Sequence, residues 1–355
     1  MTTLVALVLM VGCVRHPVQP ADPPLVTILC YHTFDNPKVN PYTIDTRTLD
    51  RQMRFLAVQH IPVIPLSQLV AYLEGKGTIP ERAVVITIDD GYETARTKAW
   101  PVMRRYGFPF TLFIYVQAIS RHGSALTWEE VRDMSNAGVD VESHSYTHPL
   151  LTHPGHAMTK ADYRAWLDHE LQDSKREIEQ HIGKPVLSLA YPYGGYDEQV
   201  VEKAKAVGYT SALTCDDGDV TRTTDAWHLN RRLVFHATRI KEFTAYFRGK
   251  PLLVSDLTPR DGERVTGPPN QIAARILNVQ QILPETAKIL VDKISRHWMP
   301  ASIDLKSGIL HFSVPKTDKK GYYFVSIMAR DRAFPQTWRE ATWIFIVRRN
   351  MPKSR

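Results

Sequence analysis

Residues 83–92 read AVVITIDDGY, an apolar run of mostly branched residues that ends in two adjacent aspartates and a glycine. A short run of this composition predicts a buried β-strand, with Asp89 and Asp90 at its carboxyl end. An Asp-Asp-Gly sequence after a strand is more often a turn with solvated carboxylates than a functional site. The interpretation of these two carboxylates therefore depends on the rest of the chain.

Strand-like and helix-like segments alternate between residues 26 and 235. Predicted strands cover residues 26–32, 83–89, 108–116, 139–143, 186–191 and 209–214, and predicted helices include residues 126–137, 160–182 and 200–207. Alternating βα units predict a parallel sheet, and their number favours a barrel over an open sheet. No GxGxxG sequence follows a strand, so a dinucleotide-binding Rossmann fold is not predicted.

A second polar motif, His144-Ser-Tyr-Thr-His148, closes the predicted strand at residues 139–143. Two imidazoles and one carboxylate are ligands that borderline divalent metals prefer, and three protein ligands leave room for water. An HxxxH pair arises easily by chance in a chain with 14 histidines, but both motifs end predicted strands, where a parallel barrel carries its chemistry. One aspartate would bind the metal and the other would accept a proton from water, which indicates hydrolysis. Zn²⁺ fits these ligands best, with Co²⁺, Ni²⁺ and Mn²⁺ as alternatives.

The first 24 residues predict an export signal followed by a tether. Residues 4–12 are apolar over a length that suits a signal-peptide core and is too short to span a bilayer. They lead into Met10-Val11-Gly12-Cys13, which resembles the lipobox of bacterial lipoproteins, although no basic residue precedes the apolar run. Four prolines between residues 17 and 24 predict an extended tether. We therefore predict an exported protein of the bacterial cell envelope whose membrane contact is a lipid on Cys13.

Composition places the chain among globular proteins, with 43% hydrophobic and 23% charged residues. The net charge of +7 comes from 44 basic and 37 acidic residues that are spread along the chain. No basic block with interleaved aromatic residues is present, so nucleic-acid binding is not predicted. Cys30 lies inside the first apolar run, which predicts a buried thiol, and no CxxC pattern predicts a cysteine-based zinc site.

The pattern changes after residue 250, where short β-rich runs are separated by turn residues. These runs cover residues 286–293, 309–314, 322–329 and 342–347. Their spacing predicts an all-β sandwich over residues 251–355. The segment resembles the immunoglobulin-like modules of bacterial surface enzymes, which more often space or dock an enzyme than perform chemistry.

With these motifs in place, residues 26–247 resemble the NodB-type polysaccharide deacetylases, carbohydrate esterase family 4. The resemblance rests on Ile88-Asp89-Asp90-Gly91, His144-Ser-Tyr-Thr-His148 and Tyr191-Pro192-Tyr193-Gly194. It implies a distorted (β/α) barrel of about seven strands, occupying residues 25–250. It further implies removal of acetyl groups from an N-acetylglucosamine-type polysaccharide with one divalent metal.

The resemblance also implies a role for each motif residue. Asp89 would be the catalytic base. The metal ligands would be Asp90, His144 and His148. The backbone N–H of Tyr193 would help to hold the oxyanion, and Pro192 would line the substrate site beside it.

Two positions depart from the family pattern. Ala190 stands where the family often has an arginine that pairs with the catalytic aspartate, and Arg231 is the candidate substitute. A solvated arginine is an equally good interpretation of Arg231. The family's late Leu-x-His motif is not cleanly present, and His236 is the candidate general acid. His32, at the end of the first predicted strand, is expected to line the site and contact substrate.

Three alternatives to the N-deacetylase hypothesis stay open. Removal of O-acetyl groups from xylan-like polymers would use the same residues, so the sequence does not separate an amide from an ester. A catalytically impaired surface protein that binds polysaccharide would account for the missing third-motif arginine. A non-haem iron oxygenase also uses two histidines and one carboxylate, but such enzymes usually have a double-stranded β-helix, which the βα alternation does not predict.

Overall fold

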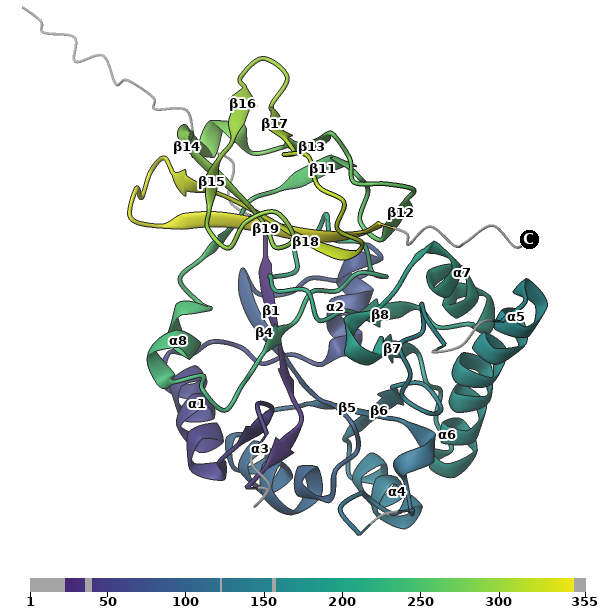
Figure 1. Ribbon diagram of the computed structural model, residues 1–355. Coiled ribbons are helices and arrows are strands. Elements are labelled where there is room, and N and C mark those ends of the chain that lie inside the picture. Colours follow the sequence, from purple (N-terminus) through teal and green to yellow (C-terminus); the bar gives the residue numbers. More distant parts are fainter. Residues whose placement is uncertain (1–22, 36–39, 122, 155–157, 348–355) are drawn as a thin grey trace, which may run out of the picture.

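The computed structural model describes residues 23–35, 40–121, 123–154 and 158–347. The predicted signal segment and Cys13 lie outside these ranges. Figure 1 shows a ring of helices around one sheet, with a second, β-rich part packed against it. None of the described helices is both long and apolar enough to cross a bilayer.

The first part is built on a parallel sheet of seven strands. In sheet order these are β8 (Ser211–Leu213), β7 (Ser188–Ala190), β6 (Asp140–Ser143), β5 (Thr111–Ile114), β4 (Arg82–Ile88), β1 (Leu25–Tyr31) and β9 (Arg232–Leu233). All residues of β1 are buried, as expected for a parallel strand covered on both faces. A two-stranded pair, β2 (Thr33–Phe34) and β3 (Thr43–Ile44), follows β1.

Residues 229–233 bring the two edges of this sheet together. Leu229 forms a parallel bridge with Leu213 of β8, and β9 pairs in parallel with β1. One short segment thus pairs with β8 at one edge of the sheet and with β1 near the other, which gives the distorted barrel of about seven strands that the sequence predicts. Arg231 lies in this closing segment, so its position depends on barrel closure.

In the described part of the chain, eight α-helices lie around the sheet (Figure 1). They are α1 (Thr46–Val58), α2 (Leu66–Leu73), α3 (Trp100–Tyr106), α4 (Trp128–Asn136), α5 (Lys160–Asp168), α6 (Ser174–Ile182), α7 (Glu198–Val207) and α8 (Ile240–Ala245). Local sequence sets the ends of two of them. Thr127 and Glu130 form a capping box at the start of α4, and Gly208 ends α7 in the left-handed conformation, with φ of 94°.

The predicted helix at residues 160–182 is interrupted. It consists of α5 and α6 joined by a π-helical turn at His169–Asp173. Such turns insert one residue into the helical repeat and often occur at functional sites. Here the turn carries Glu170, whose side chain is only 1% exposed.

The C-terminal part, residues 250–347, contains two β-sheets around a separate hydrophobic cluster. One sheet contains β10 (Lys250–Pro251), β19 (Trp338–Val347), β18 (Gly321–Asp331), β14 (Ile282–Val291) and β15 (Met299–Pro300), with β12 (Glu263–Val265) beside β19. The other contains β11 (Val254–Thr258), β13 (Gln271–Ile276), β17 (Ile309–Ser313) and β16 (Ser302–Asp304). This arrangement confirms the predicted all-β module, hereafter the C-terminal module.

The C-terminal module shares core with the barrel. Ile344 of β19 is 1% exposed and belongs to the hydrophobic cluster of the barrel, and the ring of Tyr322 packs against the same cluster. Other β19 residues, such as Trp343 and Phe345, belong to the module's own cluster. Successive residues of a strand point to opposite faces, so β19 packs against the module on one side and against the barrel on the other.

Candidate active site

The motif residues converge at the carboxyl ends of neighbouring strands. Asp89 and Asp90 follow β4, His144 follows β6, and Tyr193 lies in the turn after β7. Non-glycine residues with positive φ gather in these turns: Asp90 (76°), Ser145 (70°), His148 (60°) and Tyr193 (57°). Each such residue costs about 1–3 kcal/mol and persists where the surroundings enforce it, often at functional sites.

Asp90, His144 and His148 form a compact donor set. The Asp90 Oδ1 atom lies 3.6 Å from His144 Nε2 and 3.4 Å from His148 Nε2, and the two Nε2 atoms are 3.2 Å apart. Two ligand atoms that each bind one tetrahedral ion at about 2.1 Å are separated by about 3.4 Å. The spacing of the three donor atoms therefore fits a Zn²⁺-sized cation.

The surroundings of this set leave its donor atoms available for a metal. The Nδ1 atom of His144 lies 2.7 Å from the Ala190 carbonyl and donates to it, which directs the Nε2 lone pair towards Asp90. Burial lowers the pKa of His144 to about 3 and also lowers that of His148, so both rings are neutral. Asp90 Oδ1 is buried and accepts no hydrogen bond from any described residue.

The two adjacent aspartates differ in their electrostatic surroundings. Burial and the Asp89 carboxylate together raise the pKa of Asp90 to about 7. Burial would also raise the pKa of Asp89, but Arg231 and His144 hold it below its usual range. A cation would favour the ionised form of Asp90, because an opposite charge within a few ångströms stabilises a carboxylate.

Arg231 reaches Asp89 from the barrel-closing segment. Its Nη1 atom lies 2.8 Å from each Asp89 oxygen, and both side chains are almost completely buried, at 0% and 1% exposure. Its Nε donates to the Thr214 carbonyl at 2.8 Å, and the guanidinium lies over the Phe113 ring. The pair links residues that are 142 positions apart in sequence.

Two cysteines flank the Arg231–Asp89 pair. The Cys30 thiol is fully buried, as predicted, and lies 3.5 Å from Asp89 Oδ2. Cys215 Sγ lies 3.8 Å from Arg231 Nη2. Both thiols are free, and burial raises the pKa of each, that of Cys215 to about 11. The two thiols are therefore neutral and add no charge beside the ion pair.

His32 lies beside the same carboxylate. A ring nitrogen of His32 is within 4.8 Å of both Cys30 Sγ and an Asp89 oxygen. Its Nδ1 atom is buried without a hydrogen-bond partner among the described residues, and burial lowers the pKa of the ring to about 4. His32 is therefore oriented within the site with an unused ring nitrogen.

His236 is placed differently. Its side chain is exposed, its Nδ1 lies 3.0 Å from the Thr43 carbonyl, and its backbone N–H donates to Pro41. Within the described residues, these contacts do not reach Asp89 or the donor set. The structure therefore places His236, the general-acid candidate from sequence, in an exposed turn after β9.

Aromatic rings border the donor set on the solvent side. Tyr193 and Tyr115 lie with their ring centres 4.7 and 5.1 Å from that of His148, and Tyr42 lies 4.8 Å from His32. Tyr193 is 69% exposed and Tyr42 is 41% exposed, whereas Pro192 is buried. The exposed rings offer stacking surfaces to a sugar, whereas Pro192 begins the turn that carries Tyr193.

Glu170 was not recognised as a candidate from the sequence. Its carboxylate accepts hydrogen bonds from the backbone N–H groups of Tyr146 and Thr147, at 3.1 and 2.9 Å, and from the Thr147 hydroxyl at 2.6 Å. It therefore fixes the backbone between His144 and His148. A charged residue at one position of a predicted helix gives no signal of this role, because only the π-helical turn directs it inward.

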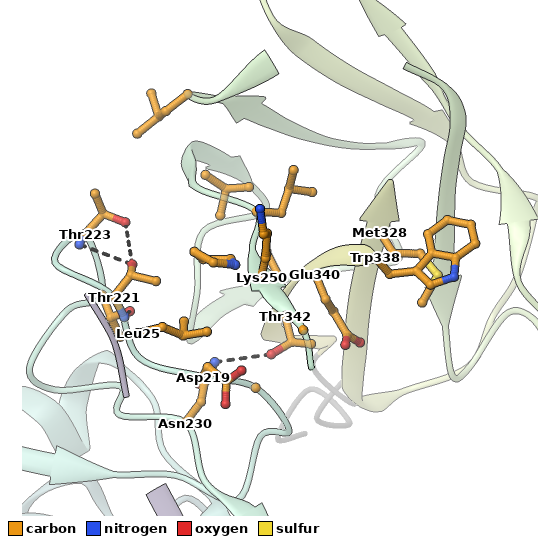
Figure 2. A pocket seen from close by; sticks show the side chains of 18 of the residues that line it. Leu25, Asp219, Thr221, Thr223, Asn230, Lys250, Met328, Trp338, Glu340 and Thr342 are labelled. Carbon is orange, nitrogen blue, oxygen red and sulfur yellow. Dashed lines mark hydrogen bonds between the residues drawn. The ribbon is translucent and has the colours of Figure 1, made fainter. Parts of the chain in front are cut away.

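A cavity of about 1220 Å³ lies away from this site, between the barrel and the C-terminal module (Figure 2). Asp219 and Asn230 line it from the barrel, and Lys250, Glu340 and Thr342 line it from the module. The donor set and Asp89 are not among its lining residues. This cavity is therefore separate from the candidate active site.

The sequence profile of the family described as polysaccharide deacetylase matches residues 76–212. The matched range contains both aspartates, both histidines of the donor set and Tyr193. The chain carries a polysaccharide deacetylase domain. Two components of the site lie outside the matched range, namely Arg231 and His32.

Curated relatives align with most of their own length. YxkH of Bacillus subtilis is 25% identical over 229 residues, which are 64% of this chain and 78% of YxkH. The poly-β-1,6-N-acetyl-D-glucosamine N-deacetylase of Staphylococcus epidermidis is 26% identical over 224 residues, 59% of this chain and 75% of that protein.

Solved structures show the same barrel. The deacetylase PplD of Streptococcus pyogenes, in complex with acetate, superposes with a TM-score of 0.57 at 19% identity, covering 63% of this chain and 98% of PplD. IcaB from Ammonifex degensii gives a TM-score of 0.56 at 24% identity, covering 64% of this chain and 97% of IcaB. At these identities the likeness concerns the fold of the deacetylase domain.

Proposed function

We propose that this protein hydrolyses acetyl groups from an extracellular N-acetylglucosamine-type polysaccharide in a metal-dependent reaction. One observation carries the proposal: the three-ligand donor set lies beside a carboxylate, Asp89, that Arg231 keeps ionised. A protein that only binds polysaccharide does not need a base next to a set of metal ligands. The N-deacetylase relatives support an amide of an acetylated amino sugar as the bond that is cleaved.

The metal proposal rests on the donor set of Asp90, His144 and His148. A divalent cation there, with Zn²⁺ the best fit and Co²⁺, Ni²⁺ or Mn²⁺ as alternatives, would polarise the acetyl carbonyl and lower the pKa of a water molecule. The remaining chemistry belongs to the protein's own side chains and backbone.

Asp89 is the proposed base. It would accept a proton from the water that attacks the acetyl carbon, and the Tyr193 backbone N–H would donate to the carbonyl oxygen as negative charge develops on it. Removing one such donor typically raises the activation barrier by about 3 kcal/mol. Because Arg231 holds the pKa of Asp89 low, Asp89 would release the proton readily afterwards.

The leaving amine needs a proton, and we propose His32 as its donor in place of His236. His32 lies within 4.8 Å of Asp89 and has a buried ring nitrogen without a partner among the described residues, whereas His236 is exposed and bonded to Thr43. With its pKa lowered to about 4, His32 is neutral at rest. It would receive the proton from Asp89 and pass it to nitrogen as the C–N bond breaks, leaving acetate and an amine.

The proposal extends to the location and organisation of the chain. We propose an exported lipoprotein anchored through Cys13, with a tether to residue 24, a deacetylase domain over residues 25–250 and the C-terminal module over residues 251–355. Incorporation of labelled palmitate by the wild type, and its loss in Cys13→Ser, would support the anchor. Equal labelling of both proteins would contradict it.

The test of function is acetate release from β-1,6- and β-1,4-linked N-acetylglucosamine oligomers by the purified protein. We expect release that disappears after chelation and returns with Zn²⁺ or Co²⁺. Acetylated xylan oligomers run in parallel distinguish an O-acetyl esterase. Absence of release from all three substrates with every metal, despite bound metal, would favour a binding protein.

A further inference from the structure

Three barrel segments that carry site residues each contact the C-terminal module. The first follows the metal-ligand candidate His148. Four residues on, the Thr152 hydroxyl is hydrogen-bonded to the Tyr322 hydroxyl of β18. Arg264 of β12 also donates from Nη2 to the Thr152 carbonyl at 3.1 Å. Both the side chain and the backbone of Thr152 are thus held by module residues.

The second segment follows Tyr193. The Asp197 carboxylate, 1% exposed, caps the start of α7 by accepting from the Val200 N–H at 2.9 Å, and it forms an ion pair with Arg264. The neighbouring Tyr196 hydroxyl donates to Asp261 of the module at 2.7 Å. Arg264 therefore bridges the turn after Tyr193 and the segment after His148.

Tyr322 reaches the same turn. A Cβ atom at Gly195 would lie 3.0 Å from the Tyr322 hydroxyl, and it would also collide with Leu150. The absence of a side chain at Gly195 thus allows the module tyrosine to enter between the two barrel segments. Tyr322 is half-buried there, with its ring against the barrel core.

The third segment precedes Arg231. Figure 2 shows the hydrogen bond, 3.2 Å long, from the Asn230 side chain to the Thr342 hydroxyl of β19. The Thr342 hydroxyl in turn donates to the Asp217 carbonyl. Arg231 itself bonds through its backbone N–H to the Asp216 carbonyl. Thr342 therefore contacts both chain segments that hold Arg231, one at Asn230 and the other at Asp217.

We propose that the C-terminal module is a positioning element of the active site, with Tyr322, Arg264 and Thr342 as positioning residues. It would fix the turns that carry His148 and Tyr193 and the segment that carries Arg231. The kinetic test of this inference rests on the deacetylase function proposed above. The metal-binding test does not depend on that function. It replaces the expectation that the module serves only as a spacer or docking domain.

The first test compares two tyrosines of one strand. Tyr322→Phe removes the hydroxyl that contacts Thr152, whereas the control Tyr323→Phe removes a hydroxyl that donates to Lys319 within the module. We expect Tyr322→Phe to weaken Zn²⁺ binding about 10-fold, the lower end of the range for indirect partners of metal ligands. Zn²⁺ affinity is measured by competition with a chromophoric chelator on the full chain.

Tyr323→Phe should leave Zn²⁺ affinity unchanged. Loss of thermal stability in Tyr322→Phe with wild-type Zn²⁺ affinity and wild-type kcat would overturn the proposal, because the contact would then only hold the two parts together. The Zn²⁺ readout needs no substrate, so a failure of the proposed function leaves this test intact.

The second test acts through Arg231. Thr342→Val removes the hydroxyl at nearly constant volume, and Thr342→Ser keeps it. We expect Thr342→Val to lower kcat several-fold with little change in KM or Zn²⁺ affinity, since Arg231 contacts Asp89 and not the metal ligands. Thr342→Ser should recover most of the rate. Equal rates in both variants would overturn the role of Thr342.

Discussion

Asp89 and Asp90 are chain neighbours with opposite electrostatic surroundings. Both oxygens of Asp89 contact Arg231 Nη1, and the pKa of Asp89 stays below its usual range, whereas the pKa of Asp90 is raised to about 7 by burial and by Asp89. Pairs of carboxyl groups whose pKa values are pushed apart commonly divide two tasks. At the residue scale, this difference motivates assigning the base to one and the metal to the other.

We predict that Asp89→Asn lowers kcat by about 10²- to 10⁴-fold, the usual contribution of a general base. Bound metal should remain near one ion per chain, because the donor set is untouched, and this is measured by elemental analysis. Asp90→Asn is the control and should lose the metal. Loss of metal from Asp89→Asn with retention in Asp90→Asn would mean that the two roles are reversed.

Arg231→Lys tests how the base is kept ionised. Lysine keeps the charge but lacks the planar fork, and the bond to the Thr214 carbonyl is lost. Weaker pairing raises the pKa of Asp89, so the base becomes protonated at higher pH. We predict that the acid limb of the pH profile of kcat/KM moves to higher pH.

The matched control for this change is Arg232→Lys. Its guanidinium pairs with Asp217 and Asp219, and neither of these contacts Asp89 in the structure. The acid limb should stay in place for this variant. An unmoved limb in Arg231→Lys would show that Arg231 does not set the protonation of the base.

At the scale of elements, short irregular features determine the site geometry. The π-helical turn between α5 and α6 directs Glu170 under the backbone that joins His144 to His148. A regular helix over the same residues would place this side chain differently, since each extra residue rotates the helical register. The interruption therefore links a surface helix to the donor set.

Glu170→Gln should lower Zn²⁺ affinity about 10-fold and the free energy of unfolding by about 1–3 kcal/mol, because hydrogen bonds to a charged acceptor are lost. Chelator competition and urea denaturation measure the two effects. Glu177→Gln is the control on α6, since the hydrogen bond that Glu177 accepts from this region comes from the Tyr146 side-chain hydroxyl, at 2.9 Å, and not from the backbone. Equal Zn²⁺ affinity in both variants would contradict the role given to Glu170.

At the scale of the whole molecule, the barrel and the C-terminal module share apolar and polar contacts. Ile344 of the module lies in the barrel core, and a buried ion pair joins Arg264 to Asp197. Interfaces of this kind couple the unfolding of two parts, because neither retains its full core alone. We therefore expect the barrel and the C-terminal module to unfold as one cooperative unit.

We predict a single calorimetric unfolding transition for the full chain. Ile344→Ala should split or broaden it, since truncating a buried isoleucine costs about 2–5 kcal/mol and here falls on the shared contact. Ile327→Ala, in the module's own cluster, is the volume-matched control and should lower the midpoint without splitting the transition. Two separate transitions in the wild type would contradict the shared core.

Sequence by itself determined the parallel βα barrel, the all-β module and the two motifs that supply the candidate donor set and the proposed base. These features follow from local physics: buried strands are apolar runs, helix ends carry capping residues such as Thr127 and Gly208, and chemistry gathers where parallel strands end. Asp89, Asp90, His144 and His148 each lie within a few residues of such a strand, so local patterns were enough to find them.

Only the tertiary structure decided the partners of those residues. Arg231 meets Asp89 across 142 positions because barrel closure places it there, and the sequence left a solvated arginine as an equal alternative. The same holds for His32, which the fold puts beside Asp89 while His236 stays on an outer loop. Contacts between distant segments depend on closure and packing, which no local pattern encodes.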